Sequence, residues 1–361
     1  MALKSGLLVI NHVMDDSDPY LSHQAEVVRL LAEKFQKICV ITGRIGNHSA
    51  PPNVRVISSH WVPGHGFRNL IRFICVIAPK LFSREHKVIF SHMADLQAAV
   101  IAPFVRLVGK RHFLWYAHSY KSVYLSWASI WINGVISSTG GSCPIQNGKV
   151  TLIGQSVNPK MFPARDSTKL NKNLLVHVGR LDRSKNIDLL IQATISIQKL
   201  NSGARLTLIG SSANVESSDY LSELTTSYGL EIDAGTVSFI PSIPREKLSA
   251  ALREFDIFIH AYEGSLDKTL IEATFSLMPV ITINPEYASI FGTWSNLPSP
   301  TLYQEYLALN AMSNSEISKQ LHRRFNIAKS SHSSDQWIQK LSEILAPSSD
   351  YKARTRTEGA L

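Results

Sequence analysis

Short apolar runs alternate along this chain with amphipathic segments, and this alternation constrains the fold more than any other feature. Leu7–Ile10 is a continuous apolar run, Gln24–Phe35 has apolar residues at helical spacing, and Ile38–Thr42 is the next apolar run. Such a strand, helix, strand order is typical of parallel sheets that are covered by helices. The same order returns between Leu174 and Ile283. We therefore predict an α/β chain with two parallel sheets.

The length of the chain and a polar segment indicate two domains. A chain of 361 residues is long for one hydrophobic core, and the polar segment Asn158–Asn173 separates the two series of strands and helices. We expect two doubly wound Rossmann-like domains facing a cleft, over residues 1–158 and 159–346. The last amphipathic helix, Gln336–Leu345, is expected to return towards the first domain. The Ser/Arg/Thr-rich tail, 347–361, is expected to be disordered.

The first chemical motif follows the strand that opens the second series. Gly179 lets the chain turn tightly off this strand, and Arg180 and Lys185 follow it. A guanidinium can donate to two phosphate oxygens, and an ammonium adds a point charge, so the pair suits a diphosphate. The alternative is that both are solvated cations at an ordinary turn between a strand and a helix.

The second motif is the turn and helix Glu263–Glu272. Backbone amides near Gly264 and Ser265 would face an anion at the helix start, and Ser265 or Asp267 can cap the helix. Glu272, about one turn into the helix, can accept hydrogen bonds from a ribose. The alternative is an ordinary capped helix with a Lys268–Glu272 pair. The predicted binding residues for a nucleoside diphosphate are Gly179, Arg180, Lys185, Gly264, Ser265, Thr269 and Glu272.

Taken as a set, these segments resemble the retaining glycosyltransferases of family 4, which have the GT-B fold. The segments that carry the resemblance are Val178-Gly-Arg-Leu-x-x-x-Lys185, Leu206–Gly210, Val237–Ile240, Phe255–Ile259, Glu263-Gly264, Leu270–Ala273 and Met278–Val280, with a weaker likeness at Trp115–His118 and Leu152–Gln155. The resemblance implies sugar transfer from a nucleotide-sugar donor to a glycan or lipid-linked acceptor with retention at the anomeric carbon. It implies no cofactor and no essential metal.

The resemblance also suggests roles for individual residues. His118, Glu263 and Lys268 would orient the sugar, Arg180 and Lys185 would offset charge on the leaving diphosphate, and no protein nucleophile is evident. The chain departs from the family at two places. Eight residues separate Glu263 and Glu272, one more than is typical, so Asp267 or Lys268 can take part of the first glutamate's role. The loop Asp15–His23 lacks the family's glycine pair. A catalytically impaired GT-B scaffold that binds a nucleotide or glycan is the alternative.

The charge balance points to anionic partners. The net charge is +9, and Phe67–Lys87 mixes basic residues with large apolar ones, which suits an anionic membrane surface. The alternative for this segment is a core helix with a basic outer face. Asp16-Ser-Asp18 could suggest a metal, but it lies outside the predicted donor site and no His/Cys cluster accompanies it, so no metal is predicted.

Several classes of protein are excluded or disfavoured. The first strand is not followed by Gly-x-Gly-x-x-Gly, which disfavours a nicotinamide oxidoreductase, and the dispersed basic residues carry no nucleic-acid recognition motif. Residues 1–10 lack the apolar region and the cleavage site of a signal peptide, and no run of 18 apolar residues occurs, so we expect neither a signal peptide nor a membrane-spanning helix. Cys39, Cys75 and Cys143 are scattered, and we expect free thiols that are mostly buried. We expect a cytoplasmic protein that works at the inner face of the plasma membrane in synthesis of cell-surface polysaccharide or glycolipid.

Overall fold

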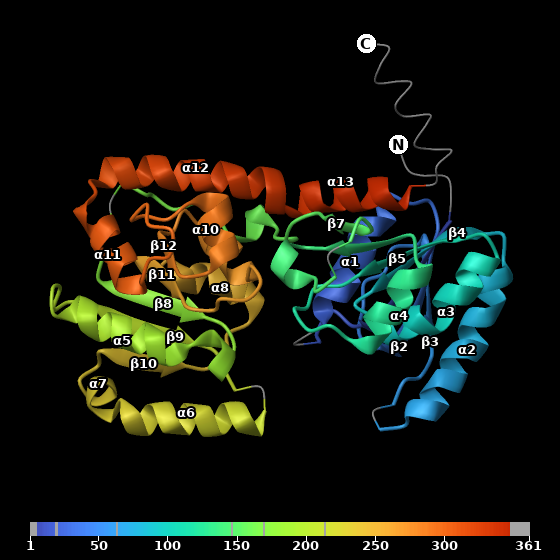
Figure 1. Ribbon diagram of the computed structural model, residues 1–361, viewed down its shortest axis with the longest axis horizontal. Helices are drawn as coiled ribbons and strands as arrows, with labels where there is room; N and C mark the ends of the chain where they lie inside the picture. Colours follow the sequence, from blue (N-terminus) through green and yellow to red (C-terminus); the bar gives the residue numbers. More distant parts are fainter. Residues whose placement is uncertain are drawn as a thin grey trace, which may run out of the picture. The chain divides into compact units, whose positions relative to one another are not determined.

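The computed structural model describes residues 6–18, 21–62, 64–145, 147–168, 170–212 and 214–346, and its chain forms two compact units (Figure 1). The first unit combines Met1–Ile153 with Trp337–Leu361, and the second is Gly154–Gln336. The tail predicted to be disordered, 347–361, lies outside the described residues.

The first unit contains a seven-stranded parallel sheet. Its strand order is β3-β2-β1-β4-β5-β6-β7, in which the chain runs outward in both directions from β1 and β4, as in doubly wound folds. The strands are β1 (Gly6–Met14), β2 (Ile38–Ile45), β3 (Val54–Ser58), β4 (His86–His92), β5 (Arg111–Trp115), β6 (Gly134–Ser137) and β7 (Val150–Leu152).

Helices cover both faces of this sheet. One core joins the sheet to α1 (Ser22–Ala32) and to the part of α13 (Ser334–Leu345) that begins at Trp337, whose ring centroid lies 5.2 Å from that of Trp115. Two further cores lie under α2 (Gly66–Phe82), α3 (Asp95–Leu107) and α4 (Val123–Trp131). The amphipathic face predicted for the last helix is therefore buried in the first unit.

The second unit contains a five-stranded parallel sheet in the order β10-β9-β8-β11-β12. Its strands are β8 (Leu174–Val178), β9 (Arg205–Ile209), β10 (Val237–Ile240), β11 (Ile257–His260) and β12 (Val280–Thr282). Its helices are α5 (Ile187–Gln198), α6 (Val215–Ser227), α7 (Gly229–Asp233), α8 (Arg245–Leu252), α9 (Lys268–Phe275), α10 (Pro285–Phe291), α11 (Leu302–Ala311) and α12 (Asn314–His332). One core lies under α5, α6 and α11, and another lies under α8, α9 and α10.

The two units differ from the expected domains at both boundaries. The first boundary falls at Ile153 instead of residue 158, because the Gln155 amide donates to His332 Nδ1 (3.1 Å) and Val157 pairs with Ser333. The second falls at Gln336 instead of residue 346, because the rest of α13 packs in the first unit.

The α/β fold with two doubly wound parallel sheets is confirmed. Within the described residues, no helix is both long enough and apolar enough to cross a membrane. Cys39 and Cys143 are buried, whereas Cys75 is exposed because it lies on the outer face of α2.

Candidate functional site

The turn after β8 brings two cations of the first motif to the carboxyl end of the second sheet. The Gly179 amide donates to the Ile209 carbonyl (3.1 Å), which continues the pairing of β8 with β9 for one residue. A Cβ on Gly210 would lie 1.9 Å from the Gly179 carbonyl oxygen, so glycine is required there for the close approach of the two chains. Arg180 follows with its side chain largely exposed and its Nε 3.6 Å from Asp182 Oδ2. This guanidinium is accessible to a ligand.

Lys185 differs from Arg180 because its side chain is buried. It ends the 3₁₀ turn η3 (Arg183–Lys185), and only 6 % of the residue is exposed. Its Nζ lies 2.5 Å from Asp267 Oδ2 and 3.8 Å from the centre of the Tyr262 ring. The ammonium is thus held between the carboxylate of Asp267, from the second motif, and the ring of Tyr262, which directly precedes that motif. The two motifs meet at this side chain.

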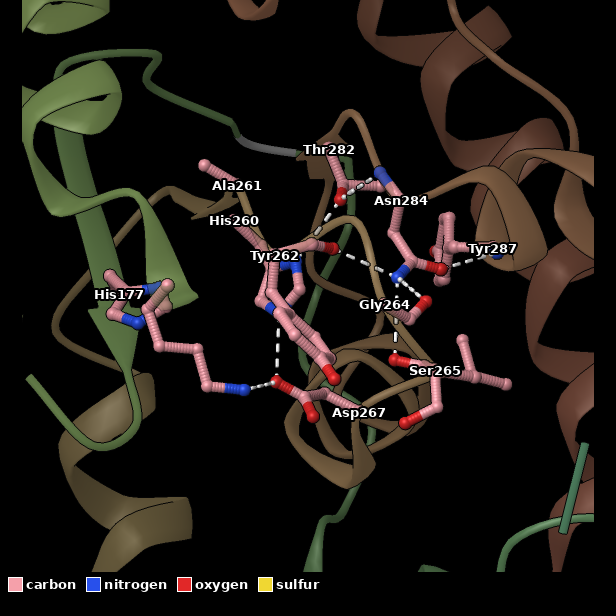
Figure 2. A network of polar contacts seen from close by, with 12 residues as sticks. His177, His260, Ala261, Tyr262, Gly264, Ser265, Asp267, Thr282, Asn284 and Tyr287 are labelled. Carbon is pink, nitrogen blue, oxygen red and sulfur yellow. Dashed lines mark hydrogen bonds and ion pairs between the residues drawn. The ribbon is translucent and has the colours of Figure 1, made fainter. Parts of the chain in front are cut away.

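Asp267 also accepts a hydrogen bond from His260, the last residue of β11 (Figure 2). His260 Nε2 lies 3.0 Å from Asp267 Oδ2, and His260 Nδ1 lies 3.2 Å from the Thr282 hydroxyl. Because the Asp267 carboxylate can only accept, the proton of a neutral His260 lies on Nε2, and Nδ1 then accepts from the Thr282 hydroxyl, whose oxygen accepts from the backbone amide of Asn284 (3.0 Å).

The charges of this buried group follow from its contacts. Burial acts to raise the pKa of Asp267, but the hydrogen bond from His260 and the charge of Lys185 hold that pKa well below its usual value. Burial lowers the pKa of His260, although Asp267 acts to raise it. The group therefore consists of an ammonium, a carboxylate and a neutral imidazole.

The turn before α9 is held in place by side chains from the next strand and helix. Asn284 Nδ2 donates to the carbonyls of Tyr262 (2.9 Å), Gly264 (3.1 Å) and Ser265 (3.4 Å), and Figure 2 shows these contacts. A Cβ on Gly264 would lie 2.1 Å from the Tyr262 hydroxyl, so the aromatic ring needs a glycine beneath it. The Leu266 amide donates to Glu286 (2.6 Å). The backbone that faces Lys185 is therefore rigid.

The start of α9 has no side-chain cap from its N-cap residue. Asp267 occupies the N-cap position, but within the described chain its side chain makes no capping hydrogen bond. The prediction that Ser265 or Asp267 caps this helix is therefore wrong, because the Asp267 carboxylate is turned to Lys185 and His260 instead. The Thr269 hydroxyl is buried and has no hydrogen-bond partner among the described residues. A helix start without a side-chain cap, the Thr269 hydroxyl and the Lys185 ammonium together suit a phosphate.

Glu272 lies on the buried side of α9 and is 1 % exposed. Its carboxylate forms an ion pair with Arg245 at the start of α8. The partner found for Glu272 therefore comes from another helix, whereas the sequence suggested either a ribose or a local pair with Lys268. Arg245 thus supplies the positive charge that balances the buried Glu272 carboxylate.

Glu263 is exposed and lines a hollow of about 510 Å³ whose other walls come from α5, α10, the segment 298–303 and the end of β12, including Thr282, the hydrogen-bond partner of His260. The side chain that contacts the buried cation is Asp267 instead, as the longer spacing between Glu263 and Glu272 allows. The predicted sugar-orienting roles of Glu263 and Lys268 remain predictions.

The remaining predicted residues lie in the first unit. His118 follows β5, is exposed, and has its ring centroid 5.6 Å from that of Tyr116. Asp16 forms an ion pair with Arg29, and Asp18 forms one with Arg44. Across the described residues, no group of three or more His, Cys, Asp or Glu side chains could hold a metal ion. The carboxylates of Asp16-Ser-Asp18 are thus bound to arginines.

The comparisons with known proteins agree with this geometry. Residues 162–290 match the family described as glycosyl transferases group 1. The matched segment contains the turn after β8, the turn before α9 and the partners Asn284 and Glu286. A search of curated proteins finds no match.

Solved structures of similar fold extend over nearly the whole chain. A UDP complex of HepE from Anabaena has 14 % sequence identity and a TM-score of 0.71, and covers 94 % of this chain and 99 % of that chain. Sucrose-phosphate synthase from Thermosynechococcus elongatus has 15 % identity and a TM-score of 0.70, with 94 % and 98 % covered. A glycosyltransferase from Rickettsia africae has 12 % identity and a TM-score of 0.68, with 95 % and 98 % covered. The predicted resemblance to GT-B glycosyltransferases is confirmed.

Several residues of the site were not predicted as site residues. They are Arg245, His260, Tyr262, Asp267 and Asn284. His260 could have been found, because it is a polar residue at the carboxyl end of a buried parallel strand, where ligands meet such sheets. Asp267 was considered as a substitute for the first glutamate, and the ion pair with Lys185 now gives it a contact. Arg245 has no comparable signal in the sequence.

Proposed function

We propose that this protein transfers a sugar from a nucleoside diphosphate sugar to an acceptor hydroxyl, with retention of configuration at the anomeric carbon. The observation that carries the proposal is the buried Lys185 ammonium beside the uncapped start of α9 and the unpartnered Thr269 hydroxyl. With a neutral ligand, the Asp267 carboxylate would be the only negative group beside this ammonium. A diphosphate can instead interact with the ammonium and accept hydrogen bonds from the helix start and the Thr269 hydroxyl.

The proposed reaction depends on stabilising the leaving group. As the bond from the anomeric carbon to the diphosphate oxygen breaks, negative charge grows on the diphosphate. Arg180, Lys185 and the amides of α9 stabilise that charge. The acceptor oxygen attacks on the same face, and its proton goes to the departing phosphate oxygen. In this proposal Glu272 holds the ribose, and His118, Glu263 and Lys268 orient the sugar.

The acceptor is proposed to be a glycan or a lipid-linked glycan, in synthesis of a cell-surface polysaccharide or glycolipid, with an anionic membrane surface as a further partner. The positive net charge supports this part of the proposal. Uridine diphosphate is the first nucleotide to test, because HepE from Anabaena was solved with UDP and with UDP-glucose. We propose that no metal is needed, and turnover in excess chelator tests this.

The test compares two arginines of one loop. Arg180 is proposed to bind the diphosphate, whereas Arg183 is exposed, pairs with Glu223 and lies over Tyr220. Arg180→Ala should weaken UDP binding by about 1.5–3 kcal/mol, the value of one charge-assisted contact, and Arg183→Ala should leave it unchanged. Calorimetric titration with UDP, GDP, ADP and CMP identifies the nucleotide. Equal affinity in both variants and the wild type would contradict the assignment of this turn.

The second candidate is a GT-B scaffold that binds a nucleotide or glycan without turnover. It is favoured by one observation: Asp267, and not Glu263, forms the ion pair with Lys185, and Glu263 is exposed. Release of free nucleoside diphosphate from the sugar donor by the purified protein separates the two functions. A scaffold binds the donor and releases none.

A further inference from the structure

Helix α2 has an apolar stripe on the side that faces away from the sheet. Its inner side is buried through Phe73, Ile77 and Leu81. Its outer side carries four exposed large apolar residues, which we call the α2 stripe: Phe67 (76 % exposed), Ile71 (46 %), Ile74 (43 %) and Phe82 (72 %). A surface helix normally presents polar residues to water on this side. Helix α2 is therefore a core helix that also has an apolar outer face, and its binding to a membrane remains a prediction.

The residues around the stripe are mostly basic. Between residues 66 and 111 the sequence has eight Lys or Arg and two acids. One of these acids, Glu85, forms an ion pair with Lys37. Arg68 and Arg72 follow Phe67 and Ile71 by one residue each, and at helical spacing they border the stripe along one side. An apolar stripe with a basic border is typical of helices that lie at a lipid interface.

A basic hollow opens at the C-terminal end of the stripe. Its volume is about 680 Å³, and Phe82 belongs both to its wall and to the stripe. It lies where β4 and β5 begin, at the edge of the sheet opposite to the carboxyl ends of the strands. We call it the basic pocket, and its charged or titratable wall residues are Arg84, His86, Lys87, Lys110 and Arg111.

Two of these cations hold helix ends and two are exposed. Lys110 Nζ donates to the carbonyls of Lys80 (3.1 Å) and Ser83 (2.6 Å), and Arg111 donates to the Ile344 carbonyl (3.0 Å). Arg84 and Lys87 are exposed at the rim. These interactions of Lys110 and Arg111 are with neutral carbonyls, so the pocket retains its positive charge.

His86 also lines the pocket, but it does not supply a contact for a ligand. It is 1 % exposed, its Nε2 lies 3.5 Å from the Glu85 carboxylate, and its Nδ1 lies close to Gly6. The four cations Arg84, Lys87, Lys110 and Arg111 therefore make the pocket suited to an anionic oxygen group.

We propose that the α2 stripe docks on the surface of an anionic bilayer and that the basic pocket takes the phosphate of a lipid headgroup. The stripe supplies apolar side chains for the acyl boundary, and its border and pocket supply the cations that an anionic surface attracts. This inference rests on the membrane partner in the proposed function and names the surface responsible. The nucleoside diphosphate site lies in the other unit, so the two can be tested separately.

The experiment is co-sedimentation of the full chain with vesicles of phosphatidylcholine alone or mixed with phosphatidylglycerol. We expect binding to the mixed vesicles that weakens with salt. Arg84→Gln/Lys87→Gln should weaken partitioning roughly thirtyfold, because each Lys or Arg near an anionic surface contributes about fivefold. The matched control, Lys199→Gln/Arg253→Gln, removes two exposed cations of the second unit and should bind like the wild type. If both double variants bind the mixed vesicles equally well, the proposal that the basic pocket takes a headgroup phosphate is wrong.

The apolar part is tested by Phe67→Ser/Ile74→Ser against Val215→Ser/Leu230→Ser, which alters exposed apolar residues of the second unit. The first should lose vesicle binding and the second should keep it. Equal pelleting with neutral and anionic vesicles, or binding of free glycerol phosphate without vesicle binding, overturns the proposal. UDP titration of the same variants separates the two claims. A variant that loses vesicle binding but keeps its UDP affinity supports the proposed membrane surface. If the wild type binds vesicles but no nucleotide, the proposed function is contradicted and the membrane surface is not.

Discussion

Lys185 and Asp267 are joined by an ion pair of 2.5 Å between Nζ and Oδ2, which connects the turn after β8 to the start of α9. The two residues are 82 positions apart, and each belongs to a motif that the sequence linked to a diphosphate. His260 holds the same carboxylate from β11. Asp267 therefore places a negative charge beside Lys185, as a bound diphosphate would. The Lys185 ammonium is thereby held where the diphosphate is proposed to bind.

Replacing Asp267 by Asn should destabilise the protein and strengthen its response to a diphosphate. The variant leaves the Lys185 ammonium buried without its carboxylate, at a cost of roughly 3 kcal/mol. A bound diphosphate restores the missing negative charge. We therefore expect the melting temperature to fall without ligand and to rise more with UDP than in the wild type. Thermal unfolding with and without UDP measures both effects.

The control for Asp267→Asn is Glu223→Gln, which breaks the surface pair with Arg183. This pair is more than half exposed on both sides, so its loss should cost at most about 1 kcal/mol. If Asp267→Asn melts like the wild type, then the ion pair contributes little and Asp267 does not position Lys185.

Gly264→Ala should disturb the turn through Tyr262. The new Cβ would lie 2.1 Å from the Tyr262 hydroxyl, so the ring must move off the Lys185 ammonium. Forcing one extra carbon into a packed site typically costs about 1–3 kcal/mol. We expect lower stability in urea unfolding and weaker UDP binding.

A second substitution distinguishes the clash from a backbone effect. In a Tyr262→Ala background the added Cβ no longer meets a ring, so Gly264→Ala should cost much less there. Gly229→Ala is the control, because a Cβ at Gly229 meets no atom within 4 Å. An equal cost in both backgrounds would show that the backbone, and not Tyr262, requires glycine.

Glu272→Gln should reduce turnover more than Glu263→Gln. Glu272 is buried in α9 and pairs with Arg245, whereas Glu263 is exposed and forms no ion pair with Lys185. Glu272→Gln should also lower stability, by about 1 kcal/mol, because Arg245 loses its charged partner but is itself 45 % exposed. Steady-state kinetics and urea unfolding test the two parts. If Glu263→Gln abolishes turnover and Glu272→Gln does not, the sugar binds in a different position from the one proposed.

The fold could be predicted from the sequence because its strands are buried on both faces. Leu7–Ile10 and Ile257–Ile259 read as continuous apolar runs, and both are central strands of parallel sheets. Helices α10, α11 and α12 were not predicted. They follow the last strand, β12, so the alternation of strands and helices gives no signal for them. The capping boxes of α11, Thr301 with Gln304, and of α12, Ser313 with Glu316, were available signals for two of them.

The site was predicted in part, and its charged partners explain the limit. Gly179, Arg180 and Lys185 lie where a strand ends, so their position follows from local spacing. Lys185 meets Asp267 because β8 and β11 are neighbours in one sheet. Glu272 meets Arg245 because α9 and α8 both pack on that sheet. Spacing along the chain carries no information on such contacts between distant segments.

The buried His177 should make the protein less stable in mild acid. Burial, aided by the nearby His260, lowers the pKa of His177 to about 3 from 6.5. Between these pH values the unfolded chain binds a proton that the folded chain does not, so stability is full above about pH 6.5 and falls towards pH 3. The slope approaches about 1.4 kcal/mol per pH unit for this one group. His177→Phe should remove that share of the slope in urea unfolding at a series of pH values.

His322→Gln, which changes an exposed histidine of α12, is the control. If His177→Phe keeps the wild-type slope while the control does too, His177 is charged in the folded protein and this account of its burial fails.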